Sequence, residues 1–361
     1  MVLPVLLGIG GCFQTQFPRE LRLGVEGVPN QQLPVWPPPP ELARYQYAGQ
    51  LWGVENFVIT EAGKKEMEGA HQAQQALMWF VGYDPSAAEA HRKHSEGLQR
   101  PLAGVADKAG RIYVTDMGQQ AVVVFDPSSA ELRVWKQASP KSTFVAPSGI
   151  VIGAAQQILV ADADLGRVIR LSPTGEPVGE FGDEELQRPT GMARDAARGR
   201  IYVADTQAHD IKVFDDSGKL IKKFGRSGRM PGEFNAPTHL AFAQDRLYVA
   251  DTLNARIQVF DSGGEFLFTF GQRGVRVGNL VRPKGVAVDG LGNIYVVESL
   301  HDYLLVYDSK GEFLMPIGGT GKEIGQFYLP SGVWTDANNR VFVADMFNGR
   351  VMIFRFLGGG K

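Results

Sequence analysis

The sequence contains few of the residues that form common kinds of site. It has one cysteine, Cys12, so no disulfide can form within the chain. Six histidines are spread over 361 residues, and the formal net charge is −2. Because there is no excess of basic residues to hold a phosphate backbone, we expect no nucleic-acid partner. The sequence also has no nucleophile elbow, phosphate-binding loop or paired-cysteine motif.

Long apolar runs are equally scarce, and the one at the N-terminus, residues 2–11, leads directly to Cys12. This run is too short to span a bilayer, and it ends in small residues, as the apolar region of a secretory signal does. The tetrapeptide 9–12 resembles the lipobox of bacterial lipoproteins, in which the cysteine carries the lipid. The resemblance predicts a signal peptide over 1–11 and lipidation of Cys12, although no Lys or Arg precedes the run. The alternative is a buried N-terminal strand with an incidental cysteine.

The resemblance to a lipobox implies an exported protein whose only attachment to a membrane is its lipid. Phe13, rather than Asp, follows the cysteine, which favours the outer membrane of the bacterial cell envelope, with the protein facing the periplasm or the surface. Residues 12–40 are dense in proline, most of all at 34–40, and predict an extended polyproline spacer. A PxxP ligand for another domain is the alternative use of this segment.

The sequence is rich in a repeated motif. With 44 glycines, 21 prolines and 44% hydrophobic residues, the composition suits a turn-rich β protein. An acid ends the second predicted strand of each repeat, at intervals of 43 to 47 residues: Asp116, Asp162, Asp205, Asp251, Glu298 and Asp345. A proline opens each repeat in the same register: Pro101, Pro147, Pro189, Pro237, Pro283 and Pro330. A repeat of this length holds four short strands, and six such repeats predict a six-bladed β-propeller.

One closed propeller accounts for residues 41–361 as a single domain, and we expect a monomer. The chain ends on the third strand of the sixth repeat, near residues 351–356, which would leave an open sheet edge. Residues 44–50 resemble the last strand of a blade, as at 268–271, so we expect them to close the ring. The fold class is therefore all-β, with an extended tether before the ring.

Residues 51–99 interrupt the repeat pattern with a partly helical insertion. Met67, Ala70, Leu77, Met78 and Val81 recur at helical spacing, which predicts a helix over 61–82. A lone helix of this length is marginal in water, so we expect its apolar stripe to dock on a surface. Docking on the channel mouth and docking on a partner are the two alternatives, and we favour the mouth.

The repeats resemble NHL repeats. The likeness rests on the Pro-x-Gly opening, on the Gly-x-Ile-Tyr-Val centre at 292–296, and on the segments 251–260 and 345–354. It covers about residues 100–361 together with the closing strand. Such propellers host binding, scaffolding and catalysis alike, so the resemblance implies a fold and not a function.

The order of strands predicts one loop-rich mouth of the channel, where the acids, the loops behind them and the proline openings converge. We expect the residues after the prolines to line this mouth and to bind a ligand: Ser148, Thr190, Thr238, His239, Lys284 and Ser331. Leu102 occupies the same position in the first repeat. Lys284 and His239 are the titratable members, and they suggest a polar ligand with an anion or carboxylate. The alternative is a water-filled channel that needs no ligand.

The ring of acids suggests either a central cation or, as we prefer, carboxylates that bond the backbone of their own turns. Arg167, Arg256 and Arg350, five residues after an acid, are expected to pair with it. His209, His239 and His301 form no evident three-ligand set, and His91 with His94 in the insertion is a weak metal signal. We therefore predict a non-catalytic binding or scaffolding module, without cofactor or metal, for a protein or a small polar ligand. The alternative is a metal-dependent propeller enzyme of the lyase or lactonase type, with its site in the channel.

Overall fold

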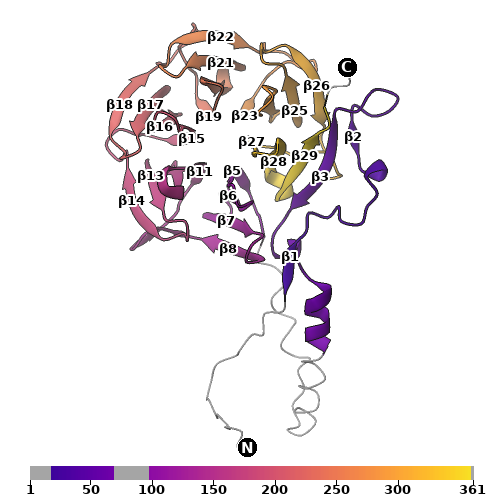
Figure 1. The fold of residues 1–361 in the computed structure, drawn as a ribbon. Helices are drawn as coiled ribbons and strands as arrows, with labels where there is room; N and C mark the ends of the chain where they lie inside the picture. Colours follow the sequence, from indigo (N-terminus) through magenta and orange to yellow (C-terminus); the bar gives the residue numbers. More distant parts are fainter. Residues whose placement is uncertain (1–17, 69–96, 359–361) are drawn as a thin grey trace, which may run out of the picture.

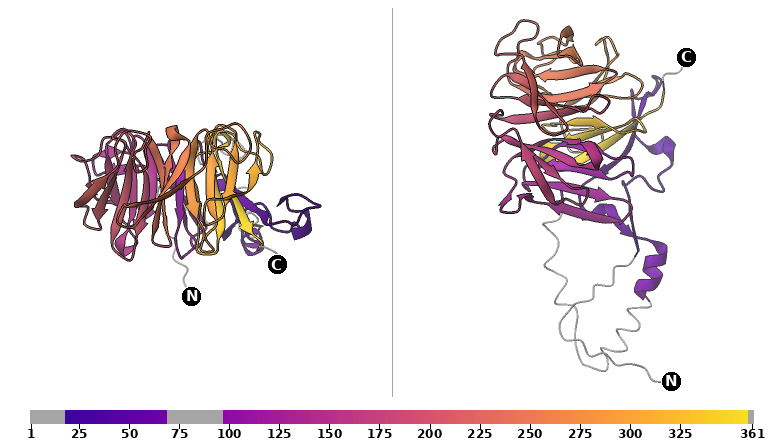
Figure 2. Two further views of the ribbon diagram at one scale, coloured as in Figure 1. Left: turned by 90° about the horizontal axis from the view of Figure 1, so that it is seen from above. Right: turned by 60° about the vertical axis from the view of Figure 1, so that its left-hand side comes forward.

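The six-bladed propeller predicted from the repeats is confirmed by the computed structural model, which describes residues 18–68 and 97–358. Six antiparallel sheets are arranged around a central axis, with the first strand of each sheet innermost (Figure 1). From the side the ring is a short cylinder, and the N-terminal segment lies on its outer wall (Figure 2).

The first three blades are four-stranded meanders. Blade one comprises β5 (Pro101–Ala106), β6 (Ile112–Asp116), β7 (Ala121–Asp126) and β8 (Glu131–Trp135). Blade two comprises β11 (Pro147–Ile152), β12 (Ile158–Asp162), β13 (Arg167–Leu171) and β14 (Pro177–Phe181). Blade three comprises β15 (Pro189–Asp195), β16 (Arg200–Asp205), β17 (Asp210–Asp215) and β18 (Leu220–Phe224).

The remaining blades complete the ring. Blade four comprises β19 (Pro237–Ala243), β20 (Arg246–Asp251), β21 (Arg256–Asp261) and β22 (Phe266–Phe270). Blade five comprises β23 (Pro283–Val288), β24 (Ile294–Glu298), β25 (Tyr303–Tyr307) and β26 (Phe313–Gly318). Blade six comprises β27 (Val333–Thr335), β28 (Arg340–Asp345), β29 (Arg350–Phe356), β3 (Tyr45–Leu51) and β2 (Val35–Trp36).

The hydrophobic core lies between the blades, because each sheet packs both of its faces on neighbours. One cluster joins Tyr202 of blade three to Leu240 and Phe260 of blade four, and the other interfaces repeat this arrangement. The second strands β16 and β20 are buried from their second residue onward, so their apolar residues follow one another without alternation. Each large side chain buried in this way stabilises the ring by roughly 1.5–3 kcal/mol.

The ring is closed by a strand from the N-terminal side of the chain. β3 pairs antiparallel with β29, so the segment expected to complete the sixth blade occupies that place. Tyr45 is 1% exposed, and its hydroxyl lies 3.2 Å from that of Tyr295 in blade five. β2 adds a fifth strand outside β3, and Trp36 packs edge-on against Phe354.

The expected spacer over 12–40 differs from the structure where the chain is described. β1 (Arg19–Leu21) pairs with β4 (Phe57–Ile59), and the amide of Gln50 donates to Leu23 O at 2.9 Å. A short 3₁₀ turn, η1 (Asn30–Gln32), separates β1 from β2. Proline enrichment therefore accompanies a segment that packs along blade six, because the edge of β3 offers it hydrogen bonds. In the part of the chain that is described, no helix is long and apolar enough to cross a membrane.

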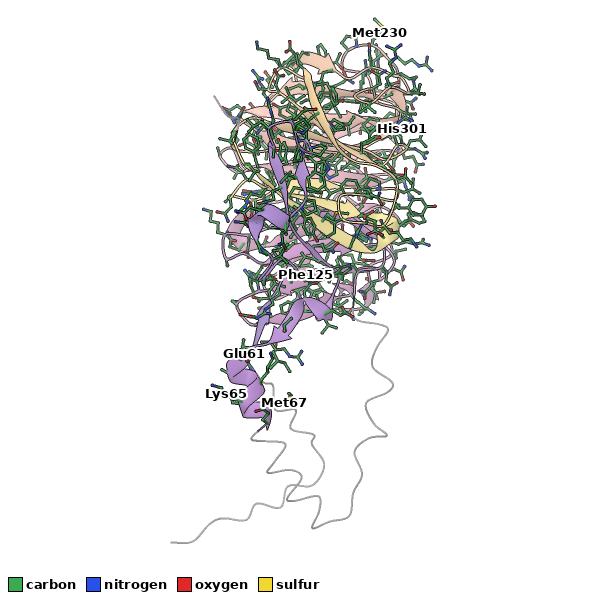
Figure 3. All side chains as sticks on the ribbon, turned by 90° about the vertical axis from the view of Figure 1, so that its right-hand side faces the viewer. Glu61, Lys65, Met67, Phe125, Met230 and His301 are labelled. Carbon is green, nitrogen blue, oxygen red and sulfur yellow. The ribbon has the colours of Figure 1, made fainter. Side chains whose placement is uncertain are left out.

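The insertion after β3 begins with η2 (Val54–Asn56) and β4, and a helix over 61–68 follows. Figure 3 shows these helical turns, with Glu61, Lys65 and Met67, beyond the edge of the ring rather than over the channel. The other expected stripe residues, and His91 with His94, lie outside the described residues, as does Cys12. Smaller elements complete the fold: β9 (Gln137–Ser139), β10 (Ser142–Thr143), η4 (Ala154–Gln156), η5 (Thr252–Asn254) and η6 (Met346–Asn348).

Candidate functional site: the central channel and its mouth

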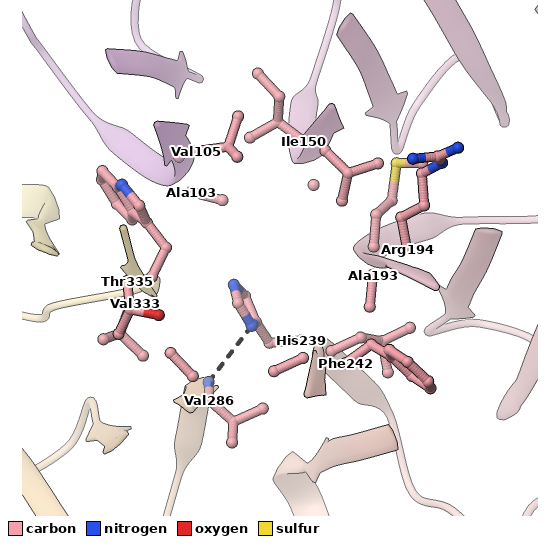
Figure 4. A pocket seen from close by; sticks show the side chains of 18 of the residues that line it. Ala103, Val105, Ile150, Ala193, Arg194, His239, Phe242, Val286, Val333 and Thr335 are labelled. Atoms are coloured by element: carbon pink, nitrogen blue, oxygen red, sulfur yellow. Dashed lines mark hydrogen bonds between the residues drawn. The ribbon is translucent and has the colours of Figure 1, made fainter. Parts of the chain in front are cut away.

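A cavity of ≈ 200 Å³ occupies the axis of the propeller and is lined by the first strands of all six blades. Its wall is largely aliphatic and aromatic, including Val105, Ile150, Met192, Phe242, Val286 and Trp334. His239, Arg194 and Thr335 are polar side chains among the described lining residues (Figure 4), and Trp334 adds an indole N–H. The wall of this axial cavity is therefore largely apolar.

His239 projects toward the middle of this cavity (Figure 4). Its Nδ1 accepts a hydrogen bond from the backbone N–H of Val286 at 3.4 Å, which places the proton of a neutral imidazole on Nε2. Burial lowers the pKa of His239 to about 4, since the apolar wall penalises the charged form. At neutral pH the cavity thus presents an uncharged N–H donor.

Arg194 and Thr335 of the cavity wall already have partners, whereas the indole N–H of Trp334 is buried without one. Arg194 makes a bidentate ion pair with Asp216, at 2.9 and 2.8 Å, near the end of β15. The hydroxyl of Thr335 donates to the carbonyl of Val288 at 3.0 Å. Since Arg194 is neutralised locally, it adds no net charge to the cavity.

The predicted hydroxyl residues take part in hydrogen bonds between neighbouring blades. Ser148 Oγ donates to Pro189 O at 3.1 Å, and Ser331 Oγ donates to Pro101 O at 2.9 Å. Thr190 and Thr238 act through a second threonine: Thr190 Oγ1 lies 2.6 Å from Thr206, and Thr238 Oγ1 lies 2.6 Å from Thr252. Thr206 and Thr252 in turn donate to Pro237 O and Pro283 O of the next blades. These hydroxyls have a structural use, and a contact with a ligand stays a prediction.

Of the six residues predicted to bind a ligand, only His239 lies on the wall of the axial cavity. Lys284 lies at the start of β23, and within the described residues no acceptor is within hydrogen-bond distance of its ammonium group. Burial, with a smaller contribution from the charge of Arg282, lowers the pKa of Lys284 below its usual value. Lys284 lies two residues before Val286, whose N–H bonds His239 Nδ1, so that binding of one ligand by both residues stays a prediction.

The six acids at the ends of the second strands are almost completely buried and face backbone amides. Asp116 accepts from Gln99 and Arg100, and Asp205 from Gln187 and Arg188. Each acid thereby fixes the loop that leads into the first strand of its own blade. This arrangement favours the backbone-bonding role over a central cation.

The expected pairing of arginines with these acids is correct in two blades and wrong in one. Arg256 and Arg350 bond Asp251 and Asp345, both at 2.8 Å. Arg167 pairs instead with Glu180, at 2.6 Å, because β14 presents that carboxylate beside it. In blade three, Lys212 takes the place of the arginine and bridges Asp205 and Asp210, at 2.8 and 2.6 Å.

The histidines of the propeller lie apart and are used locally. His209 Nδ1 accepts from the amide of Ala236 at 3.0 Å, whereas His301 Nδ1 lies 3.0 Å from Glu298 Oε2. Among the described residues, no group of three or more His, Cys, Asp or Glu is arranged to hold a metal ion. The side chains of the described channel wall do not fit the metal that the enzyme alternative requires.

Exposed apolar residues are concentrated on one face of the propeller, which was not predicted from the sequence. We call this the mouth face: it carries the loops that follow the second and fourth strands of each blade. Eleven large apolar residues are exposed there: Trp52, Met117, Val145, Met230, Leu253, Val275, Val277, Leu300, Ile324, Tyr328 and Phe347. In the described turns of the opposite face, Leu291 is the only one. Leu253, Leu300 and Phe347 each follow an acid by two residues, a regularity that could have been found in the sequence.

The class of protein follows from this architecture: a closed six-bladed propeller with an apolar axial cavity and an exposed apolar mouth face. The family model described as the SMP-30/gluconolactonase/LRE-like region matches residues 103–318, which is more than half of the chain. The chain belongs to this family. No curated protein matches it.

Solved structures with the same fold have varied descriptions. A virginiamycin B lyase from Staphylococcus aureus is 14% identical with a TM-score of 0.54, covering 71% of this chain and 80% of that one. A gluconolactonase from Xanthomonas campestris is 17% identical with a TM-score of 0.55, covering 72% and 86%. An auxiliary nutrient binding protein from Bacteroides thetaiotaomicron is 12% identical with a TM-score of 0.56, covering 73% and 70%. At these identities the likeness concerns the fold alone.

Proposed function

We propose that this chain is a non-catalytic binding module whose mouth face docks a protein partner. The observation that carries the proposal is the unequal distribution of exposed large apolar side chains: eleven lie on the mouth face, and Leu291 alone lies in the described turns opposite. Exposed apolar groups gathered on one face of a soluble propeller are typical of an interaction surface. A protein suits this surface better than a small polar ligand, because the apolar groups come from loops around much of the ring.

Charge on the mouth face indicates the chemistry of the partner. The linker 271–282 carries Arg273, Arg276 and Arg282 and no carboxylate. None of the three arginines forms an ion pair within the described residues. The linker between blades two and three has the opposite character, with three acids at 183–185. The partner is therefore an apolar surface flanked by carboxylates on the side that meets blades four and five.

The finer assignments belong to the same proposal. The repeats are of NHL type, and the protein is exported and anchored to the bacterial cell envelope through lipid on Cys12. With the chain packed on blade six from Arg19 onward, few residues separate Cys12 from the propeller. At about 3.5 Å per extended residue, the anchor lies within roughly 25 Å of Arg19. The propeller would then sit close to the membrane, without a long spacer.

The docking proposal is tested with two matched leucines. Leu300 is 49% exposed on the mouth face beside Arg276, and Leu291 is 62% exposed on the opposite face. Wild type, Leu300→Glu and Leu291→Glu would each be used to capture partners from detergent-solubilised membranes, with quantitative mass spectrometry. We expect a protein retained by wild type and Leu291→Glu but depleted with Leu300→Glu. If every captured protein is retained equally by the three forms, the mouth face is not the docking surface.

A further inference from the structure

We propose that the axial cavity binds a neutral, single-ring small molecule that presents a hydrogen-bond acceptor to His239 Nε2. This site is separate from the mouth face and goes beyond the proposed docking of a protein. It rests on the shape and lining of the cavity and on the orientation of one imidazole.

The size of the cavity sets the size of the ligand. Its volume is ≈ 200 Å³. An apolar cavity of about 150 Å³ in another protein stays dry and binds benzene. A cavity somewhat larger than that accommodates one six-membered ring together with a small substituent.

The wall requires an apolar body. Val105, Ile150 and Val286 come from three different blades, and the wall between them is also largely apolar. A ligand that covers this surface gains roughly 25 cal/mol for each Å² of apolar area removed from water. A charged ligand would lose its hydration here without an opposite charge to replace it, because Arg194 is already paired with Asp216.

The free N–H of His239 that faces the cavity defines the acceptor, whereas the indole N–H of Trp334, which also lacks a partner, is buried in the wall. The hydrogen bond from Val286 occupies His239 Nδ1, so Nε2–H is left as a donor that faces the cavity (Figure 4). The depressed pKa of His239 keeps the ring neutral at pH 7, which favours a carbonyl or ether oxygen over a carboxylate. This differs from the anion that the sequence alone suggested for His239.

Three probes separate the contributions of the apolar ring, the hydrogen-bond acceptor and the charge to binding. Cyclohexanone has a ring and an acceptor, benzene has the ring alone, and benzoate adds a charge. Binding would be followed on the intact protein by the ¹H–¹⁵N resonance of the Trp334 indole, which lies in the cavity wall. Dissociation constants would be measured at pH 7.5. We expect cyclohexanone to bind more tightly than benzene, and benzoate to bind weakest.

Variants of His239 test the acceptor. One hydrogen bond is worth about 0.5–1.5 kcal/mol. His239→Leu should therefore weaken the binding of cyclohexanone about 2- to 12-fold and leave the affinity for benzene unchanged. His239→Gln keeps an N–H donor and should restore much of the affinity, which also guards against a folding defect in the leucine variant. The proposal is overturned if no probe shifts the Trp334 resonance, if benzoate binds best, or if both variants bind cyclohexanone like wild type.

Discussion

Closure of the ring by β3 makes a sharp prediction for Leu51. This side chain is 0% exposed and lies in the core cluster shared by blades six and one, with Phe57, Phe342 and Ile353. Leu51→Ala should destabilise the protein by about 2–5 kcal/mol, because it loses the buried methyl groups and leaves a cavity that the paired strands cannot fill. The melting temperature should fall by roughly 3–8 °C for a domain of this size.

Leu42→Ala is the matched control, since Leu42 is 65% exposed and lies just before the same strand. Both variants would be unfolded in urea and followed by tryptophan fluorescence and by far-ultraviolet circular dichroism, so that coincident transitions verify two-state behaviour. The control should stay within about 0.5 kcal/mol of wild type. If Leu51→Ala were no more destabilising than Leu42→Ala, β3 would not be the strand that closes the ring.

Three further predictions concern the blade contacts, the channel and the anchor. Thr252→Val removes the hydroxyl that donates to Pro283 O at 2.7 Å and should cost about 1–3 kcal/mol in urea unfolding, whereas exposed Thr174→Val should be nearly neutral. The pKa of His239 is lowered to about 4 in the folded protein. Between pH 6.5 and 4 this imidazole is therefore protonated in the unfolded chain but neutral in the folded one. Wild type should therefore lose up to about 3 kcal/mol more stability than His239→Gln as the pH falls through that window, and parallel pH profiles would contradict this. Cys12→Ala should move the protein from the membrane to the soluble fraction, and native mass spectrometry that finds an unmodified Cys12 would disprove lipidation.

The architecture could be predicted because two markers recur for physical reasons. The prolines open the innermost strands, and the acids bond the amides of the loops before them, as Asp205 does with Gln187 and Arg188. Both requirements are local, so each repeat shows them in its own sequence. The missing fourth strand of blade six was also visible, since an open sheet edge must be covered.

The site was harder to predict because its properties depend on contacts between blades. Nothing in a single repeat shows that Thr252 donates to the next blade. Strand spacing alone also does not show that Arg167 bonds Glu180 of its own blade, although Asp162 is its register partner. The same limit applies to residues 18–40, whose prolines resemble a spacer although their neighbours pair with β3 and β4. The hydroxyl residues after the prolines form contacts between blades, and of the six predicted residues only His239 lines the axial cavity.

Pairing of β3 with β29 also sets the order of events during synthesis. Gln50 and Arg350, whose side chains are hydrogen-bonded at 3.2 Å, lie 300 residues apart in the chain. At about 5–20 residues per second, a ribosome needs roughly 15–60 s to supply the second partner after the first. Throughout that interval β3 can pair with β2 on one edge but lacks β29 on the other, and the blades between them have no closed ring to join. The last contact to form thus has the greatest sequence separation, which makes the nascent chain dependent on protection from aggregation until its final strand emerges.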